Sequence, residues 1–333
     1  MTILVTGGAG YIGSHTVKHL KDCGYRCIVL DNLVYGHKEA ICVPDFEQGD
    51  LLDQAFLARV FQKYQFDVVI HFAAYAYVGE SVENPRKYYT NNVVGTLNLL
   101  NAMLEVGVKK IVFSSTCATY GDPVYIPLDE EHIQNPINPY GQSKLMAEKI
   151  LADYLKAYGL KYIALRYFNA AGASTDGEIG ECHHPETHLI PLVLKAITGN
   201  RKAISVFGND YDTKDGTCVR DYIHVEDLAA AHQAALDKLD TFSGCINLGT
   251  GVGTSVNEVI KAAEQVTGLP CPTEYVPRRL GDPDVLYAAN DMAKQVLGWS
   301  PHYTKIEELI DSAWKWEQKI ILNDGRFPKQ IGG

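Results

Sequence analysis

The chain has 333 residues, of which 46% are apolar and 21% are charged, a composition typical of a folded globular enzyme and unlike that of a disordered chain. At this length we expect about two domains. The formal net charge is −10, so the surface should on average repel nucleic acid and anionic membrane.

The eight cysteines form no CxxC pair and show no zinc-type spacing. The sequence starts directly with a predicted strand rather than a signal peptide, and it contains no apolar run of about 18 residues. We therefore expect a cytoplasmic protein with free thiols and with neither a nucleic acid nor a membrane as partner.

A glycine-rich turn follows the first predicted strand, residues 3–6. Gly7, Gly10 and Gly13 lie at the start of an amphipathic helix, so that backbone N–H groups and the positive helix end can face a pyrophosphate. A second predicted strand ends at Asp31, 18 residues after Gly13. A carboxylate at that point can bind a ribose 2′-hydroxyl and repels a 2′-phosphate. The pattern predicts a site for NAD rather than NADP.

Strand and helix signals then alternate along the first half of the chain. Continuous apolar strands of this kind are typical of a parallel sheet that is buried on both faces. We therefore expect an α/β fold, a doubly wound parallel Rossmann sheet with ligands at its carboxyl edge. The further expected strands are residues 26–30, 67–70, 110–113 and 161–166. One expected helix opens at 49–51 and ends at 63, and two others span 88–104 and 139–158.

The alternation changes near Ala170. Residues 170–188 read as a loop, and an apolar segment at 189–198 follows. We predict an NAD-binding domain over residues 1–169, with parts of 220–250, and a smaller mixed C-terminal substrate domain over 170–333 that is interleaved with the first.

Four side chains in this loop are of metal-ligating types. They are Cys182, His183, His184 and His188, but the stretch has no helical HExxH register. We predict that the protein has no metal site.

A tyrosine and a lysine stand four residues apart near the start of a predicted helix. Asn138 is a good N-cap, Pro139 suits the first helical position, and Gly159 can end the helix. Tyr140 and Lys144 therefore share one helix face. Taken alone, such a pair is more often an ordinary surface pair than a catalytic one.

A catalytic role for this pair depends on the tyrosine pKa. A phenol has a pKa near 10 in water and is a poor base at neutral pH. An adjacent ammonium favours the phenolate, and a decrease of about three pKa units corresponds to roughly 4 kcal/mol. We therefore expect Lys144 to lower the pKa of Tyr140 and to make it a usable proton acceptor.

Several motifs together resemble the extended short-chain dehydrogenase/reductase superfamily. These are the glycine turn, Asp31-Asn32, Ser114-Ser115-Thr116, the Tyr140 and Lys144 pair, and Arg166-Tyr167-Phe168-Asn169. Further segments are similar to the UDP-glucose 4-epimerase family within it, so that the resemblance covers nearly the whole chain. These segments are Val78-Gly79-Glu80-Ser81, Phe207-Gly208-Asn209-Asp210-Tyr211, Asp215-Gly216-Thr217 and Val219-Arg220-Asp221-Tyr222-Ile223-His224.

The resemblance implies an enzyme that holds NAD and interconverts UDP-glucose and UDP-galactose through a 4-ketopyranose. Tyr140 would take the proton of the sugar 4-hydroxyl, Lys144 would lower the tyrosine pKa and hold the nicotinamide ribose, and Thr116 would hydrogen-bond the 4-oxygen. The implied partner is a UDP-sugar, and the family usually forms homodimers through the helices around 88–104 and 140–158.

The resemblance also implies two sets of binding residues. Cofactor contacts are expected from Gly7, Gly10, Tyr11, Ile12, Gly13, Asp31, Asn32, Asp50, Leu51, Phe72, Ala73, Ala74, Asn91, Ser114, Tyr140, Lys144 and Phe168. Substrate contacts are expected from Thr116, Tyr140, Asn169, His188, Leu189, Phe207, Arg220, Arg279, Asp282 and Leu286.

Two positions depart from the pattern of family members restricted to glucose and galactose. Ala76 stands where those members often have lysine, and Leu286 stands where they have a bulky tyrosine beside the sugar. A smaller side chain leaves room for a 2-N-acetyl group, so we expect UDP-N-acetylglucosamine and UDP-N-acetylgalactosamine as possible further substrates. The run Ala76-Tyr77-Val78-Gly79-Glu80-Ser81 also resembles epimerases that act on UDP-xylose and UDP-arabinose.

Two other functions share parts of this pattern. A sugar-nucleotide 4,6-dehydratase needs carboxylates directly after the threonine, where this chain has Cys117 and Ala118. A non-catalytic NAD-sensing module commonly lacks the tyrosine or the lysine, and here both are present. Both functions are less favoured than epimerisation.

Overall fold

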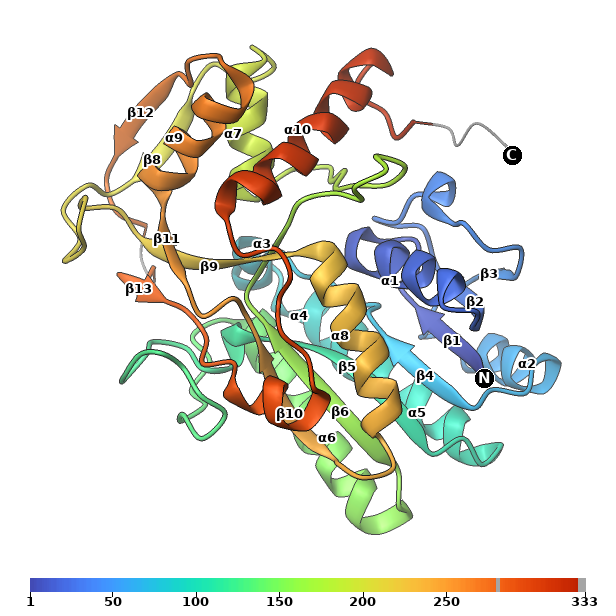
Figure 1. Cartoon of the computed structure of the whole chain (residues 1–333). Helices are drawn as coiled ribbons and strands as arrows, with labels where there is room; N and C mark the ends of the chain where they lie inside the picture. The colour runs from blue at the N-terminus through green and yellow to red at the C-terminus, as the bar shows by residue number, and fades with distance from the viewer. Residues whose placement is uncertain (280–281, 329–333) are drawn as a thin grey trace.

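The computed structural model describes residues 1–279 and 282–328 (Figure 1). A parallel seven-stranded sheet lies at its centre, in the order β10-β6-β5-β4-β1-β2-β3, which confirms the predicted doubly wound α/β fold. The strands are β1 (Thr2–Thr6), β2 (Arg26–Asp31), β3 (Phe46–Gln48), β4 (Val68–His71), β5 (Lys110–Thr116), β6 (Lys161–Tyr167) and β10 (Gly244–Leu248).

The order of the strands reverses at β1. In the sheet register, Val5 of β1 lies opposite Val29 of β2 on one side and opposite Ile70 of β4 on the other. The chain passes from β1 to β2 and β3 and then crosses back to β4. Sheets of this kind bind ligands in the crevice outside the carboxyl ends of the strands at such a reversal.

Helices cover both faces of the sheet (Figure 1). On one face, Ile3 and Val5 are fully buried in a core with residues of α1 (Tyr11–Asp22) and α8 (Val225–Lys238). On the other face, Leu4 packs with residues of three helices. The alternation follows from the two-residue period of a strand. Those three helices are α2 (Gln54–Lys63), α5 (Gly95–Glu105) and α6 (Pro139–Tyr158).

The helix expected to open at 49–51 begins later. Asp53 is its N-cap and accepts a hydrogen bond of 2.9 Å from the backbone N–H of Phe56, so α2 starts at Gln54. Asp50 precedes it in a turn, in which the N–H of Asp53 donates to the Asp50 carbonyl oxygen. The sequence prediction placed the helix start too early because Asp50 and Asp53 are both residues that N-cap positions favour.

The helix expected over 88–104 is longer and composite. It starts with α4 (Pro85–Tyr88), whose N-cap is Asn84, continues through a π-helical segment (Tyr89–Val94) and ends with α5. Pro85 occupies the first turn, where a backbone N–H would have no hydrogen-bond acceptor within the helix, so that its absence costs nothing. Single π-helical turns of this kind are frequent at functional sites.

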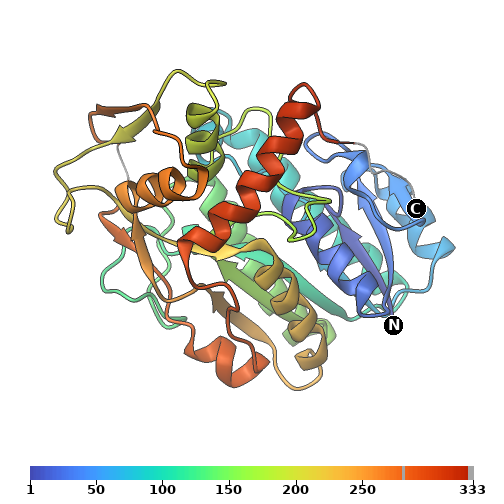
Figure 2. The same cartoon turned by 45° about the horizontal axis from the view of Figure 1, so that its top comes forward.

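A smaller unit lies beside the carboxyl edge of the large sheet (Figures 1 and 2). This unit has a hydrophobic core of its own, separate from the two that cover the faces of the large sheet, and it contains Val193, Val259 and Ile310.

The helix α8 and the strand β10, although late in the chain, belong to the layers of the large sheet. The division of the chain into two domains stays a prediction. The unit contains the strands β7 (Asn169–Ala171), β8 (Ile204–Phe207), β9 (Val219–His224), β11 (Gly253–Ser255), β12 (Thr273–Val276) and β13 (Val285–Leu286), and the helices α7 (Leu189–Ile197), α9 (Val256–Thr267) and α10 (Ile306–Leu322).

The remaining elements are short: α3 (Val78–Glu83), two 3₁₀ turns (Lys38–Ala40 and Cys117–Thr119) and a second π-helical segment (Ala293–Leu297). Within residues 1–279 and 282–328, no helix combines the length and the apolar character needed to cross a membrane.

Candidate active site

The glycine turn after β1 forms a cradle with no room for side chains. A Cβ atom on Gly7, whose φ is 74°, would lie 2.5 Å from the backbone nitrogen of Ala73, and one on Gly13 would overlap the carbonyl oxygen of Gly7. Gly10 is the N-cap of α1 and brings no side chain to the helix end. The N–H groups at this end therefore remain available to an anion, as a pyrophosphate site requires.

Asp31 ends β2 beside this cradle and is buried. Its carboxylate accepts hydrogen bonds from the N–H of Ala9, 3.0 Å away, and of Leu33, 2.8 Å away. Burial raises the pKa of this carboxyl above its ordinary value, and the two backbone donors oppose that shift. Asn32 continues the site by donating to Asp50, at 2.9 Å. The structure thus brings three predicted cofactor residues to one sheet edge.

Phe72, Ala73 and Ala74 follow β4 at the same edge. Asn91 lies in the π-helical segment and donates a hydrogen bond of 3.0 Å to Asn92. Asn92 is buried and holds the backbone of Tyr75 through two hydrogen bonds. Asn91 stays a predicted cofactor contact, and the structural role of its neighbour Asn92 was not predicted from the sequence.

The local prediction for the Tyr140 helix is confirmed. Asn138 caps α6 by accepting a hydrogen bond of 2.8 Å from the N–H of Gly141, and Gly159 ends the helix in the left-handed region at φ 69°. Lys144 lies one turn after Tyr140 and is buried. Thr116, at the end of β5, is the residue whose side chain lowers the pKa of Tyr140 against the effect of burial.

Lys144 donates a hydrogen bond of 2.7 Å from Nζ to the backbone carbonyl oxygen of Ser114. Its Nζ also lies 4.9 Å from the centre of the Phe113 ring. Burial lowers the pKa of Lys144 to about 7, and the negative charge of Glu148 opposes that shift. The amine of this lysine therefore titrates near neutral pH.

The pKa of Tyr140 is raised in this structure, whereas the sequence analysis expected it to be lowered. Burial raises the pKa of Tyr140 to about 12, and the Thr116 hydroxyl, rather than the lysine, is the group that opposes the shift. The physical reason is that desolvation penalises both charged forms, so it raises a phenol pKa and lowers an amine pKa. Sequence spacing placed the two groups on one face but contained no information on burial.

A buried ion pair supports the catalytic helix from behind. Arg166 donates to Glu148 from Nε at 2.9 Å and from Nη2 at 2.8 Å, and both side chains are almost fully buried. Ser115 donates a third hydrogen bond to the same carboxylate. Arg166 Nη1 also donates to the Tyr120 hydroxyl, at 2.9 Å. The sequence analysis quoted Arg166 only as part of a motif and missed Glu148, which is four residues after Lys144.

Four predicted substrate residues gather at the edge of the smaller unit. Asp282 lies 3.6 Å from Nη2 of Arg220 and 3.7 Å from Nε of Arg279. The Arg279 guanidinium lies 4.4 Å from the centre of the Phe207 ring. One carboxylate therefore holds two guanidinium groups near each other, which suits a clamp for a diphosphate.

Asn169 and Leu286 lie on strands that flank Arg220. Asn169, in β7, donates a hydrogen bond of 2.9 Å to the carbonyl oxygen of Asp221. β13 pairs with β9 so that Leu286 is opposite Arg220. Leu286 also packs against a small core that contains Phe168. The three residues are thus neighbours in the fold, although they are far apart in the sequence.

His188 and Leu189 stand at the start of α7, His188 as its N-cap and Leu189 as its first residue. His188 also gathers with His183 and two glutamates, Glu181 and Glu186, a grouping that the sequence analysis did not predict. Cys182 and His184, which the sequence offered beside them, are not part of that group.

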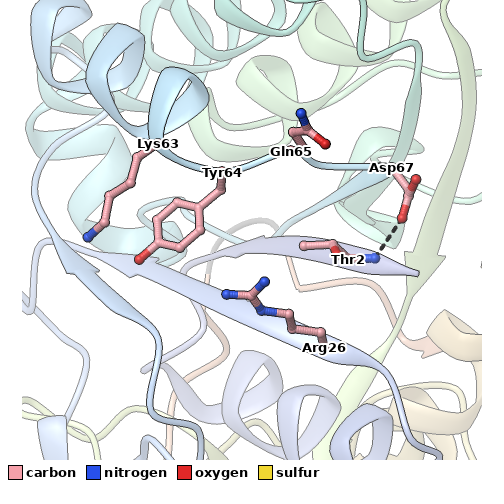
Figure 3. Close-up of a pocket in the computed structure, with 6 residues that line it drawn as sticks. All are labelled: Thr2, Arg26, Lys63, Tyr64, Gln65 and Asp67. Carbon is pink, nitrogen blue, oxygen red and sulfur yellow. Dashed lines mark hydrogen bonds between the residues drawn. The ribbon is translucent and has the colours of Figure 1, made fainter.

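A polar surface hollow lies at the opposite edge of the sheet, away from these residues (Figure 3). Thr2 and Arg26, at the beginnings of β1 and β2, border it, and the N–H of Thr2 donates to Asp67 at 2.7 Å. None of the predicted site residues lines it. We therefore place the candidate active site at the carboxyl edge.

Known proteins match nearly the whole length of this chain. The model of the NAD dependent epimerase/dehydratase family matches residues 3–249. The UDP-glucose 4-epimerase of Halalkalibacterium halodurans is 54% identical over 321 residues, 96% of each chain. The Brucella ovis UDP-glucose 4-epimerase in complex with NAD superposes with a TM-score of 0.92 at 52% identity, over 94% of this chain and 97% of that one. The Bifidobacterium longum enzyme in complex with NAD+ and UDP gives a TM-score of 0.92 at 42% identity, over 98% and 100%.

Proposed function

The chain belongs to the NAD dependent epimerase/dehydratase family, and from this we propose that it interconverts UDP-glucose and UDP-galactose by inverting carbon 4 of the sugar. It is an epimerase, and its cofactor is NAD. The resemblance stated from the sequence motifs is thereby confirmed. The observation that carries the proposal is that α6 brings Tyr140 and Lys144 to the carboxyl end of β5, beside Thr116, at the same sheet edge as the glycine cradle.

Each residue of this group has a role in the proposed reaction. When bound, NAD supplies a reversible acceptor for the hydride of carbon 4. Tyr140 takes the proton of the 4-hydroxyl and returns it, Thr116 holds the 4-oxygen by a hydrogen bond, and Lys144 is the positive charge that favours the phenolate. The 4-ketopyranose that forms must be reduced on its other face, because inversion requires the hydride to return to the opposite side.

The raised pKa of Tyr140 fits this reaction only if positive charge accumulates beside it. A phenol with a pKa of about 12 is protonated at neutral pH. A cationic group nearby favours the ionised form, and the low dielectric of a buried site strengthens that effect. We infer that Tyr140 becomes a competent base when Lys144 is protonated and the ligands have excluded water.

For the nucleotide, we propose that Arg220 and Arg279 bind the diphosphate of the UDP-sugar. Two guanidinium groups can each form two parallel hydrogen bonds with phosphate oxygens. Asp282 holds them near each other, and Phe207 offers a ring face beside Arg279. This clamp also explains how a chain of net charge −10 can bind an anionic substrate.

We further propose that N-acetylated UDP-sugars are accepted. Leu286 is partly buried beside Phe168 and opposite Arg220, next to the proposed substrate residues. A leucine there occupies less space than a tyrosine. The additional volume is what a 2-N-acetyl group would need.

Assembly and location are proposals as well. α6 carries exposed apolar side chains, among them Met146 and Tyr158, which suit the proposed homodimer contact. The cytoplasmic location and the domain division at residue 169 stay predictions from the sequence.

The experiment that tests the function follows the anomeric proton signals by NMR. The purified protein, without added NAD, is incubated with UDP-glucose and UDP-N-acetylglucosamine in separate tubes. We expect the galacto epimer in each tube. A stable 4-keto-6-deoxy sugar would instead show a dehydratase. No product in either tube, even after NAD is added, would contradict the proposed function.

A further inference from the structure

The loop between β7 and α7 brings two histidines and two glutamates to one point. Glu181, His183, Glu186 and His188 each offer one ligand atom, and these atoms all lie within 4.8 Å of one another. We call them the His/Glu cluster. None of these four side chains has a role in the proposed proton and hydride transfer.

The ligand atoms of the His/Glu cluster lie close enough together to converge on one ion. Nδ1 of His183 lies 3.0 Å from Glu181 and 3.9 Å from Glu186, and Nδ1 of His188 lies 2.5 Å and 3.3 Å from the same two carboxylates. Four ligands at the usual zinc distances stand about 3.3 to 3.6 Å apart. The two shorter contacts are those of hydrogen bonds between imidazole and carboxylate, and the two longer ones lie close to this edge length.

The charge of the His/Glu cluster needs compensation. The side chains of Glu181 and Glu186 are only 5% and 4% exposed. In residues 1–279 and 282–328, neither carboxylate forms an ion pair with a lysine or an arginine. Buried carboxylates are costly unless a positive charge neutralises them. The groups that can do so are two imidazolium ions or a cation that the four side chains share.

A divalent cation is the alternative to two imidazolium ions. The rings of His183 and His188 have their centres 5.3 Å apart, and two positive charges at that distance repel each other. A divalent cation removes this repulsion, because both histidines then bind as neutral imidazoles. Its charge of +2 matches that of the two carboxylates.

The surrounding contacts hold the loop in the shape that the cluster needs. Trp316 donates from Nε1 to the Glu181 carbonyl oxygen at 2.8 Å, and His37 bonds the Cys182 carbonyl oxygen at 2.6 Å. Glu186 itself accepts hydrogen bonds from the N–H of His188 at 2.9 Å and of the residue before it. Such supports orient metal ligands before the ion arrives.

A polar atom beside the cluster also lacks a partner. The Tyr77 hydroxyl is buried and, in the part of the chain that the structure describes, makes no hydrogen bond. The Tyr77 ring stands edge-on to that of His183, with the centres 6.2 Å apart. A water molecule on a bound cation could satisfy this hydroxyl.

We propose that the His/Glu cluster binds one divalent transition-metal ion. Two nitrogen ligands disfavour Mg²⁺ and Ca²⁺, which prefer oxygen, and imidazole with carboxylate suits Zn²⁺. The ion joins the loop at residues 181–183 to the start of α7 at His188. It therefore stabilises the loop between β7 and α7, and leaves Nε2 of His188 free for another partner.

The test measures Zn²⁺ binding to the intact protein after treatment with a chelator and dialysis. Isothermal titration with ZnCl₂ is expected to give one ion per chain with micromolar or tighter affinity, and saturation is expected to raise the melting temperature. Glu186→Gln and His183→Ala should each weaken binding by at least about 100-fold, since even changes around the ligands cost about 10- to 100-fold. His184→Ala is the matched control, because His184 is exposed and outside the cluster, and it should bind within about twofold of the unchanged chain.

The free thiols provide a second control. Alkylated protein should still bind Zn²⁺, and Co²⁺ should give the visible spectrum of a four-coordinate site without sulfur ligands, a readout that needs no variant. Loss of binding on alkylation, equal loss in His184→Ala, or no stoichiometric uptake of Zn²⁺ or Co²⁺ by the unchanged protein would each overturn the proposal.

Discussion

Nζ of Lys144 lies 2.7 Å from the backbone carbonyl oxygen of Ser114, so the amine of the α6 lysine is tied to the carboxyl end of β5. One donated hydrogen bond does not replace the hydration of an ammonium ion. Burial therefore lowers the pKa of Lys144 to about 7, and the charge state of this group becomes dependent on pH in the range where the protein works.

The first prediction concerns stability and pH. Between the ordinary lysine value of 10.5 and the folded value of about 7, the unfolded chain binds one more proton at Lys144 than the folded chain does. The contribution of Lys144 to the free energy of unfolding therefore rises with pH across this window. In nucleotide-free protein, the stability advantage of Lys144→Met over the unchanged chain should shrink from pH 7 to pH 10 in urea unfolding.

Lys149→Met is the control for this prediction, because Lys149 is exposed on the same helix. Its stability difference from the unchanged chain should stay constant across the range. Parallel pH profiles for Lys144→Met and the unchanged protein would contradict the assigned burial effect.

A second prediction concerns the proton acceptor. Tyr140→Phe removes the hydroxyl and should lower kcat for UDP-glucose by about 10²- to 10⁴-fold, since that is the usual contribution of a positioned acid or base. Tyr154→Phe removes a hydroxyl from the same helix that bonds Asn101 at 2.8 Å on the surface, and should change kcat by less than about twofold. Retained NAD, measured by its absorbance after release from the protein, should be equal in both variants. A Tyr140→Phe enzyme with near-normal kcat would exclude this tyrosine as the base.

The buried ion pair behind α6 leads to a third prediction. Glu148→Gln leaves the Arg166 guanidinium without its charge partner and should lower the free energy of unfolding by about 3 to 5 kcal/mol. Adding Arg166→Met should recover more than half of the loss, because the uncompensated charge is then gone. Arg166 holds the pKa of Glu148 below its ordinary value against the effect of burial, so the stabilisation is lost as the pH falls. A double variant no more stable than Glu148→Gln would show that the pair acts through packing instead.

The fourth prediction concerns cofactor choice. The Asp31 carboxylate accepts from two backbone N–H groups and carries the negative charge that repels a 2′-phosphate. Asp31→Asn should narrow the preference for NAD over NADP by about tenfold or more in binding titrations. Asp53→Asn, which changes only the N-cap of α2, should leave the preference unchanged. An unaltered preference in Asp31→Asn would assign the discrimination to other groups.

The fifth prediction concerns the sugar pocket. Leu286→Tyr should reduce kcat/KM for UDP-N-acetylglucosamine by about tenfold or more, because the larger ring fills the volume proposed for the acetamido group. Turnover of UDP-glucose by the same variant is the internal control and should change by less than about threefold. If N-acetyl turnover were unchanged, Leu286 would not determine specificity.

Local patterns predicted much of the fold and a large part of the site. The caps of α6 at Asn138 and Gly159 are readable because capping depends on residues within one turn of the helix end. The glycine turn and Asp31 are readable because strand, turn and helix follow one another directly in the chain. Boundaries were less certain where two residues compete for one role, as Asp50 and Asp53 do before α2.

The sequence by itself determined the parallel sheet, the edge at which we propose that the ligands bind, and the residue types on the face of α6, since each is set by short-range periodicity. Only the tertiary structure decided how those groups are solvated and which distant side chains meet them. Burial of Tyr140 and Lys144 reverses the expected direction of the tyrosine pKa, and burial comes from elements that are far away in the chain. The pairing of Glu148 with Arg166, and the convergence of the His/Glu cluster, likewise depend on the path of the chain between the residues, which no local period encodes.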